Sequence, residues 1–396
     1  MTIRHPAKVK IVPENILASG VDTLVLSMDV GWNDPSLFPF LDELKEQAKE
    51  CGADYPGELK HPFSPDPWPF TIKPHGTQGF SWILSSSAFT FKIAHRTEPG
   101  QRPGVMIEFR SEGLWHMGAA EAIRLAMGII TANGGTIVET KLSRVDLCID
   151  VLVPEELWDA DLLTYAVTRA SDYAPYYRNR QLTGIRIGKG VVSARLYDKP
   201  LEIAQQSKKI WMHDIWGIPE VPEGKKIIRV EFQMRREVLK ELGLNTPHTL
   251  LEKSVNGWAY CTKEWLKFQD RPGLHHTQRK TFQWWEAIQQ GFSGVQDAEP
   301  LVREQAVCME KKRLLQQMNG LTISLHAIRQ EQQGAALNTP ASLEDCVVSY
   351  AEELSKSPDR KADIQSRLDR KRARYHHEMV NRDKRVHKMA HTFSDS

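Results

Sequence analysis

The chain has 396 residues, a formal net charge of +2 and an apolar content of 41%. This length predicts two or three structural units, and the nearly neutral charge gives no global argument for a polyanionic partner. The five cysteines lie far apart without C-x-x-C spacing, which argues against a disulfide framework or a zinc site and favours a reducing compartment. Because no signal peptide or membrane-length apolar run occurs, we expect a cytoplasmic protein without membrane contact.

The first part of the chain alternates between strand and helix patterns. Residues 1–19 are expected to form an arm, and the alternation over 20–32 predicts a first strand. A helix is expected over 34–52, where Asp34 is a candidate N-cap and Gly52 a stop. The proline-rich stretch 55–70 predicts a loop, and short apolar runs from 70 to 110 predict a β-meander.

Beyond this meander the period becomes helical. Spacing over 114–135 predicts a helix, the alternation over 136–151 predicts a strong strand, and 154–171 has the pattern of a further helix. A glycine-containing hairpin follows at 183–203. A loop rich in Trp, Gly and Pro then leads into a strand that begins near Lys225 and a helix that stops at Gly243.

Three of these strands each combine an apolar face with a charged face. A helical layer would cover the apolar faces, since side chains alternate along a strand. If the strands are neighbours in one sheet, their charged faces could hold a hard divalent cation and a phosphate. A solvated antiparallel sheet with cross-strand salt bridges is the alternative. The charged faces carry Arg144, Asp146 and Asp150; Arg195, Tyr197 and Lys199; and Arg229 and Glu231.

Tyr197 is the candidate nucleophile of this set. On a strand from Ser193 to Lys199 it shares a face with Arg195 and Lys199, and a phenolate attacks phosphorus if cations or a metal lower its pKa. The alternative is an amphipathic edge strand, because tyrosine is common in strands. The pair Tyr176-Tyr177, in an expected loop, is a rival nucleophile or a stacking surface for unpaired bases.

The order RVDLCID, IRIGKGVVSARLYDKPLE and IRVEFQMRR resembles the Rep_trans family of rolling-circle replication initiators and the related MobT-type relaxases. On this resemblance Tyr197 is the nucleophile, in a Y-x-K-x-x-E motif that ends at Glu202. The resemblance covers about Gly20 to Leu244. It also implies that Arg195, Lys199 and Arg229 lie near the scissile phosphate, and that the metal ligands are the acidic residues Asp146, Asp150, Glu231 and Glu202.

The resemblance further implies an α+β fold, in which an antiparallel nicking sheet has helices packed on one face and a helical C-terminal region follows. The expected divisions are an arm at 1–19, a nicking domain at 20–245, a helical region at 246–358 and a basic tail at 359–396. The implied activity is Mg²⁺- or Mn²⁺-dependent nicking of an origin, through a 5′-phosphotyrosine, to start rolling-circle replication. No G-x-x-x-x-G-K-[ST] loop occurs, which fits nicking without ATP.

Several alternatives stay open at this stage. A relaxase of a conjugative element would use the same chemistry, and a non-catalytic DNA-binding regulator would keep only the sheet. Expected partners are partly single-stranded DNA, a host helicase and a second copy of the chain. The basic tail is expected to contact DNA phosphates. The histidine pairs at 275–276 and 376–377 are expected at the surface, 302–333 is expected to be a long helix, and Trp258, Trp265, Trp284 and Trp285 are expected in the core.

Overall fold

The computed structural model describes residues 6, 9–34, 36–100, 102–270 and 279–294, and the single positions 326, 330, 342, 344, 345, 347, 348 and 351. Residues 1–302 form one compact unit, and 303–396 form a second. The expected helix at 302–333 lies outside the described residues apart from His326 and Gln330. The basic tail at 359–396 and both histidine pairs also lie outside them.

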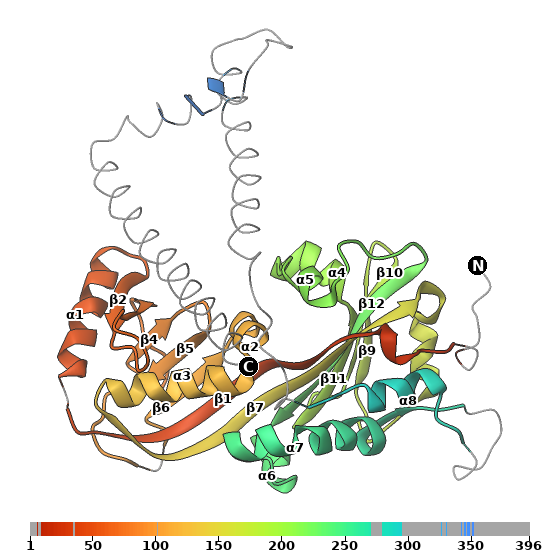
Figure 1. Ribbon diagram of the computed structural model, residues 1–396, viewed down its shortest axis with the longest axis horizontal. Helices are drawn as coiled ribbons and strands as arrows, with labels where there is room; N and C mark the ends of the chain where they lie inside the picture. Colours follow the sequence, from red (N-terminus) through yellow and green to blue (C-terminus); the bar gives the residue numbers. More distant parts are fainter. Residues whose placement is uncertain are drawn as a thin grey trace, which may run out of the picture. The chain divides into compact units, whose positions relative to one another are not determined.

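One antiparallel sheet of eleven strands organises the first unit (Figure 1), in the order β2-β3-β4-β5-β6-β1-β7-β12-β11-β10-β9. With its helices, it confirms the predicted α+β fold. The strands are β1 (Ile16–Trp32), β2 (Tyr55–Leu59), β3 (Trp68–Ile72), β4 (Trp82–Ser85), β5 (Phe89–Ile93), β6 (Val105–Phe109), β7 (Gly135–Pro154), β9 (Tyr173–Arg178), β10 (Gln181–Ile187), β11 (Val192–Asp198) and β12 (Lys225–Arg235).

The two longest strands, β1 and β7, join two halves of this sheet. They have 17 and 20 residues and pair with each other over nearly their whole length. On one side β6 pairs with β1, and the strands β5, β4, β3 and β2 follow in that order to the edge of the sheet. On the other side β12 pairs with β7 and leads outward to β9 (Figure 1).

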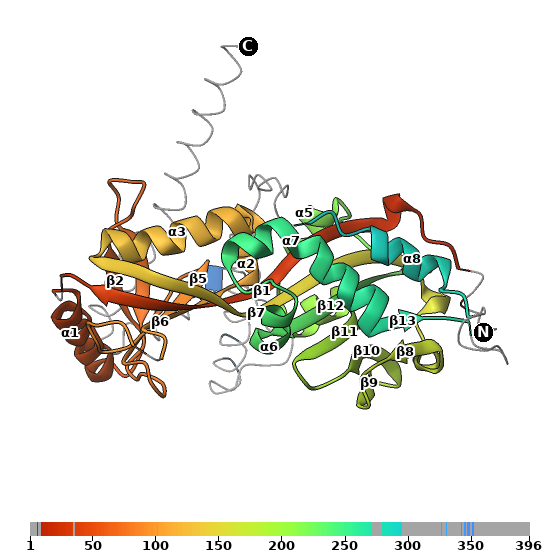
Figure 2. The ribbon, with the colours of Figure 1, turned by 90° about the horizontal axis from the view of Figure 1, so that it is seen from below.

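Helices cover the apolar face of the sheet because its strands alternate buried apolar and polar side chains. Figure 2 shows α3, α7 and α8 following one another along the sheet. The covering helices are α1 (Leu37–Glu50), α3 (Ala119–Ala132), α6 (Arg236–Glu241), α7 (Pro247–Ala259) and α8 (Gln283–Gln290). Trp258 of α7 packs edge-on against Phe232 of β12 at 5.4 Å, and all four tryptophans predicted in the core are buried. The core therefore continues through the expected boundary at residue 245.

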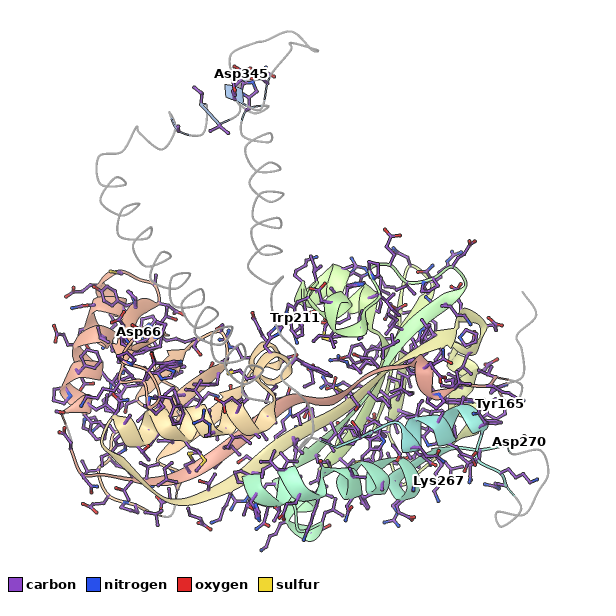
Figure 3. The ribbon with its side chains drawn as sticks, in the orientation of Figure 1. Asp66, Tyr165, Trp211, Lys267, Asp270 and Asp345 are labelled. Atoms are coloured by element: carbon purple, nitrogen blue, oxygen red, sulfur yellow. The ribbon has the colours of Figure 1, made fainter. Side chains whose placement is uncertain are left out.

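Short helices lie on the opposite face, over β1 and β12. They are α2 (Ser111–Met117), α4 (Lys199–Glu202) and α5 (Met212–Trp216). A small apolar cluster of Ile203, Met212, Trp216 and Ile227 attaches α5 to the sheet. Trp211, labelled in Figure 3, begins this helix, and its ring lies 4.7 Å from that of His116 in α2. The short helices leave part of this face uncovered.

Two expectations about proline-rich and acidic segments are wrong. The stretch 55–70 is not all loop, since β2 and β3 occupy its ends. Pro69 lies opposite Glu58 of β2, but β4 pairs only with Thr71 and Ile72, so on the β4 side no ladder partner needs a donor at Pro69. The segment 154–171 is not one helix but two 3-10 turns and β8 (Ala166–Thr168).

The segment 154–171 is held by two of its own side chains and by pairing with a strand from elsewhere in the fold. Trp158 donates to the backbone carbonyl of Leu182 at 2.9 Å, and Asp159 caps the second turn by accepting from the amide of Asp161. The strand β8 pairs with β13 (Leu266–Phe268) in a separate small sheet. Figure 3 labels Tyr165, which directly precedes β8, and Lys267 of β13.

Three smaller differences are a break in an expected helix, and a helix and a strand where loops were expected. The expected helix over 114–135 is broken at Gly118, whose φ of 77° ends α2 and starts α3. The expected loop at 211–224 contains α5, and Tyr176-Tyr177 lies on β9 instead of in a loop. Among the described residues no helix is long and apolar enough to cross a membrane.

Candidate active site

Polar residues of three adjacent strands meet on the face opposite the main core. The strands β11, β12 and β7 are neighbours, which is the condition that the predicted site required. Tyr197 lies directly opposite Arg229, which in turn lies opposite Asp150. Two residues along the strands from the Tyr197–Arg229 pair, Arg195 lies opposite Glu231. Because paired residues of an antiparallel sheet project to the same side, these five side chains share one face.

The hydroxyl of Tyr197 donates to Oε2 of Glu231 at 2.8 Å. Nη2 of Arg195 donates to Oε1 of Glu231 and to Oδ2 of Asp146, the latter at 3.2 Å. Arg144 holds Asp146 from the other side with Nε and Nη2. The side chain of Arg195 is 44% exposed, whereas those of Asp146 and Glu231 are 0% and 2% exposed. Arg195 is thus the cation beside Tyr197 that a ligand from solvent can reach.

The electrostatic surroundings keep Tyr197 protonated in the free protein. Burial, reinforced by the nearby carboxylate of Glu231, raises the pKa of Tyr197 well above its ordinary value. The expected lowering of this pKa by neighbouring cations is therefore not found. Burial, together with the charge of Asp22, raises the pKa of Glu231 to about 7. A carboxyl with that pKa, hydrogen-bonded to a phenol, is suited to accept the phenol's proton near neutral pH.

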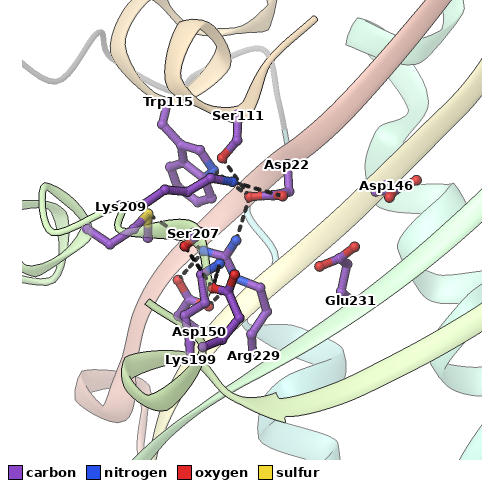
Figure 4. Close-up of polar contacts among 12 residues, drawn as sticks. Asp22, Ser111, Trp115, Asp146, Asp150, Lys199, Ser207, Lys209, Arg229 and Glu231 are labelled. Carbon is purple, nitrogen blue, oxygen red and sulfur yellow. Dashed lines mark hydrogen bonds and ion pairs between the residues drawn. The ribbon is translucent and has the colours of Figure 1, made fainter. Parts of the chain in front are cut away.

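Arg229 is fully buried and lies in an ion-pair cluster with Asp150 and Asp22 (Figure 4). Nε and Nη2 bind the two oxygens of Asp150 at 2.6 and 2.7 Å, and Nη1 binds Asp22. The indole of Trp216 donates to the same Asp150 carboxylate at 2.8 Å. Each guanidinium nitrogen of Arg229 therefore has a carboxylate partner, and the observed contacts assign it to holding β1, β7 and β12 together.

The sequence reasoning did not single out Asp22. It lies at a bulge in β1, where the register shifts between Val21 and Thr23, so the extra residue escapes simple alternation. Its carboxylate accepts from Ser111 at 2.8 Å and from the indole of Trp115 at 3.3 Å. A carboxylate inside an otherwise apolar strand pattern was the available signal for a buried polar role.

Lys199 is also buried, with an exposed fraction of 2%. It is the first residue of α4 instead of the last residue of β11, because Asp198 caps the helix by accepting from the amide of Leu201 at 3.0 Å. Its ammonium binds Glu202 at 2.7 Å and lies 5.4 Å from the ring centre of Tyr197. Burial, together with the charge of Arg229, lowers the pKa of Lys199.

The four carboxylates predicted as metal ligands do not converge. Asp150 is bound to Arg229 and Glu202 to Lys199, whereas Asp146 and Glu231 share the guanidinium of Arg195. Within the described ranges, no three His, Cys, Asp or Glu side chains are placed to hold one metal ion. The predicted four-residue metal site is therefore not assembled in this structure.

The rival tyrosine pair lies apart from these carboxylates, on the edge strand β9. The side chains of Tyr173, Tyr176 and Tyr177 are 59%, 47% and 57% exposed. Tyr176 lies opposite Gly184 of β10, which lies opposite Tyr197 on β11. Within the described part of the chain, neither Tyr176 nor Tyr177 has a carboxylate bonded to its hydroxyl, so neither has the proton acceptor that Tyr197 has.

Comparison with known proteins identifies no family for the chain. No protein-family model matches it, and no curated protein matches it significantly. Among solved structures, it is similar to a rolling-circle replication initiator protein from Geobacillus stearothermophilus, with a TM-score of 0.40 and 12% sequence identity. That match covers 72% of this chain and 97% of the other.

Proposed function

We propose that the chain is a DNA nicking and joining enzyme that binds a replication origin and starts rolling-circle replication, with Tyr197 as the nucleophile. The observation that carries this proposal is the bond from the Tyr197 hydroxyl to the buried carboxylate of Glu231, beside the exposed cation of Arg195. A nucleophile, a proton acceptor and a phosphate-binding cation are the three parts that this chemistry requires. The motif order in the sequence supports the same assignment.

The proposed step is an in-line attack on a DNA phosphodiester. The Tyr197 oxygen forms a bond to phosphorus as its proton passes to Glu231, and the bond from phosphorus to the 3′-oxygen breaks. The products are a 5′-phosphotyrosine and a 3′-oxygen that takes up a proton. Arg195 stabilises the charge that develops on the non-bridging oxygens, because a guanidinium matches phosphate geometry. Rejoining is the reverse reaction and needs no ATP.

The proposed roles of the other predicted residues follow from their contacts. Arg229, Asp150 and Asp22 fix the strands under the site, and Lys199 with Glu202 fixes α4 beside the tyrosine ring. Dependence on Mg²⁺ or Mn²⁺ stays a prediction, and no step above is assigned to a metal. Comparing nicking in each ion with nicking in a chelator tests it.

The deciding experiment incubates the full chain with supercoiled DNA carrying its own replicon and separates the products on a denaturing gel. We expect a protein-linked strand in the wild type that disappears in Tyr197→Phe. The matched control is Tyr177→Phe, which removes a tyrosine hydroxyl from the same half of the sheet and is expected to keep the adduct. Specific binding without any adduct, with either metal, would instead favour a non-catalytic regulator.

A further inference from the structure

A polar groove of about 540 Å³ lies over the other half of the sheet. Its lining includes Thr23 and Val25 of β1, Ser85 of β4 and Thr90 of β5. Thr23 pairs directly with Asp146, a member of the tyrosine network, so the groove lies on the same face of the sheet as Tyr197. This face is opposite the one that α7 and α8 cover.

Cations dominate the charge of the groove. Four lining residues are basic, Lys73, Lys92, Arg110 and Arg144, and one, Glu108, is acidic. Glu108 forms an ion pair with Lys92, and Asp146 binds Arg144. Lys73 and Arg110 are exposed, and neither has an acidic partner among the described residues. Two basic groups are thus available to an anionic ligand.

Arg144 connects the groove to the candidate active site. It lines the groove and binds Asp146, which accepts from Arg195, and Arg195 in turn binds the Glu231 carboxylate that holds Tyr197. A DNA strand with one phosphate at Tyr197 would therefore place its neighbouring phosphates near further cations and hydroxyls on the same face of the sheet. Hydroxyls and cations together form the usual contacts to a sugar-phosphate backbone.

We propose that this groove binds the single-stranded DNA segment that flanks the scissile phosphate, through its backbone and not its base sequence. The inference rests on the proposed nicking function and adds a second contact region to it. A single strand is favoured over a duplex because the groove is a confined volume with a partly apolar floor, which includes Val25 and Ile83.

The test compares two double variants that each remove two positive charges from exposed side chains. Lys73→Gln/Arg110→Gln removes the available cations of the groove. The control, Lys240→Gln/Lys253→Gln, removes cations from α6 and α7, which pack on the opposite face. Binding of long and short oligothymidylates and of a duplex to the full chain is measured by fluorescence anisotropy over a series of salt concentrations, and adduct formation is measured in parallel.

Each phosphate contact to single-stranded DNA contributes about 0.7 to the slope of log affinity against log salt, so two lost contacts lower the slope by about 1.4. We expect this loss, with several-fold weaker binding, for the groove variant on the long oligothymidylate and not for the control. The short oligothymidylate, which occupies only one region, should show a smaller loss.

Three results would overturn the inference. The first is an unchanged slope in the groove variant, and the second is an equal loss in the control. The third is a loss confined to the duplex, which would assign the groove to double-stranded DNA. If the wild type forms the Tyr197 adduct in any of these cases, the nicking function stands and only the groove assignment fails. If it neither forms an adduct nor binds DNA, both proposals fail together.

Discussion

Replacing Arg229 by Met should strongly destabilise the fold, because the guanidinium holds two carboxylates in the interior. Asp150, which is 0% exposed, would lose two of its three side-chain hydrogen bonds and keep only that from Trp216. Asp22 would keep its bonds from α2 but lose its guanidinium partner. Removing one partner of a buried ion pair costs about 3–5 kcal/mol, and we expect a loss in this range.

The measurement is urea unfolding of the full chain, followed by tryptophan fluorescence. Arg236→Met, at an exposed position at the start of α6, is the matched control and should change the free energy of unfolding by less than about 0.5 kcal/mol. The double variant Arg229→Met/Asp150→Leu should be more stable than Arg229→Met alone, because it also removes one of the two carboxylates that have lost the guanidinium.

The pH dependence of this loss provides a second check. Burial alone would raise the pKa of Asp22, but Arg229 and neighbouring lysines hold it far below its ordinary range. That stabilisation is present above the unfolded-state pKa and is lost as the pH falls, so the difference between wild type and Arg229→Met should shrink at acidic pH. A loss below about 1 kcal/mol at neutral pH would refute the structural role assigned to Arg229.

Three further outcomes follow from the site. The single-turnover nicking rate should rise about tenfold per pH unit up to about pH 7 and then level off, because Glu231 must be ionised to accept a proton. In Glu231→Gln the nicking rate should lose both this rise with pH and most of its magnitude. Tyr176→Ala/Tyr177→Ala should weaken binding of single-stranded DNA by about 1–3 kcal/mol per stacked base in an anisotropy titration, without removing the adduct; unchanged binding would exclude stacking on β9. Gly184→Val should reduce nicking more than it reduces stability, since a Cβ at Gly184 would lie 3.3 Å from that of Tyr197; equal losses in the gel assay and in urea unfolding would contradict this.

The sequence was enough to predict the strands that carry the site. Alternation along β7, β11 and β12 separates an apolar from a charged face, and this local pattern predicted the strands themselves. Their adjacency was only a condition of the site in the sequence, and it is the structure that shows it. The tryptophans of α7 and α8 were correctly placed in the core because they recur at helical spacing. Both predictions rest on periodicity, which a single sequence displays directly.

The features that were missed depend on contacts between distant segments. Asp22 reaches Arg229 only because a bulge shifts the register of β1, and periodicity does not reveal a bulge. The commitment of Asp150 and Glu202 to basic partners depends on how the strands and α4 pack, so the acidic residues looked like one ligand set in the sequence. Local pattern predicts which face a residue occupies, but tertiary packing decides its partner.

The unbroken course of β1 and β7 through both halves of the sheet has a consequence for how the molecule opens. Unfolding of either half alone would break the β1–β7 ladder that the other half shares, so we expect the backbone amide protons of these two strands to exchange in a common opening. A ligand bound over the meander should therefore slow hydrogen exchange in β7 near Asp150 as well as beneath itself. Binding at one end of the sheet would in this way stabilise the strands that hold the tyrosine at the other.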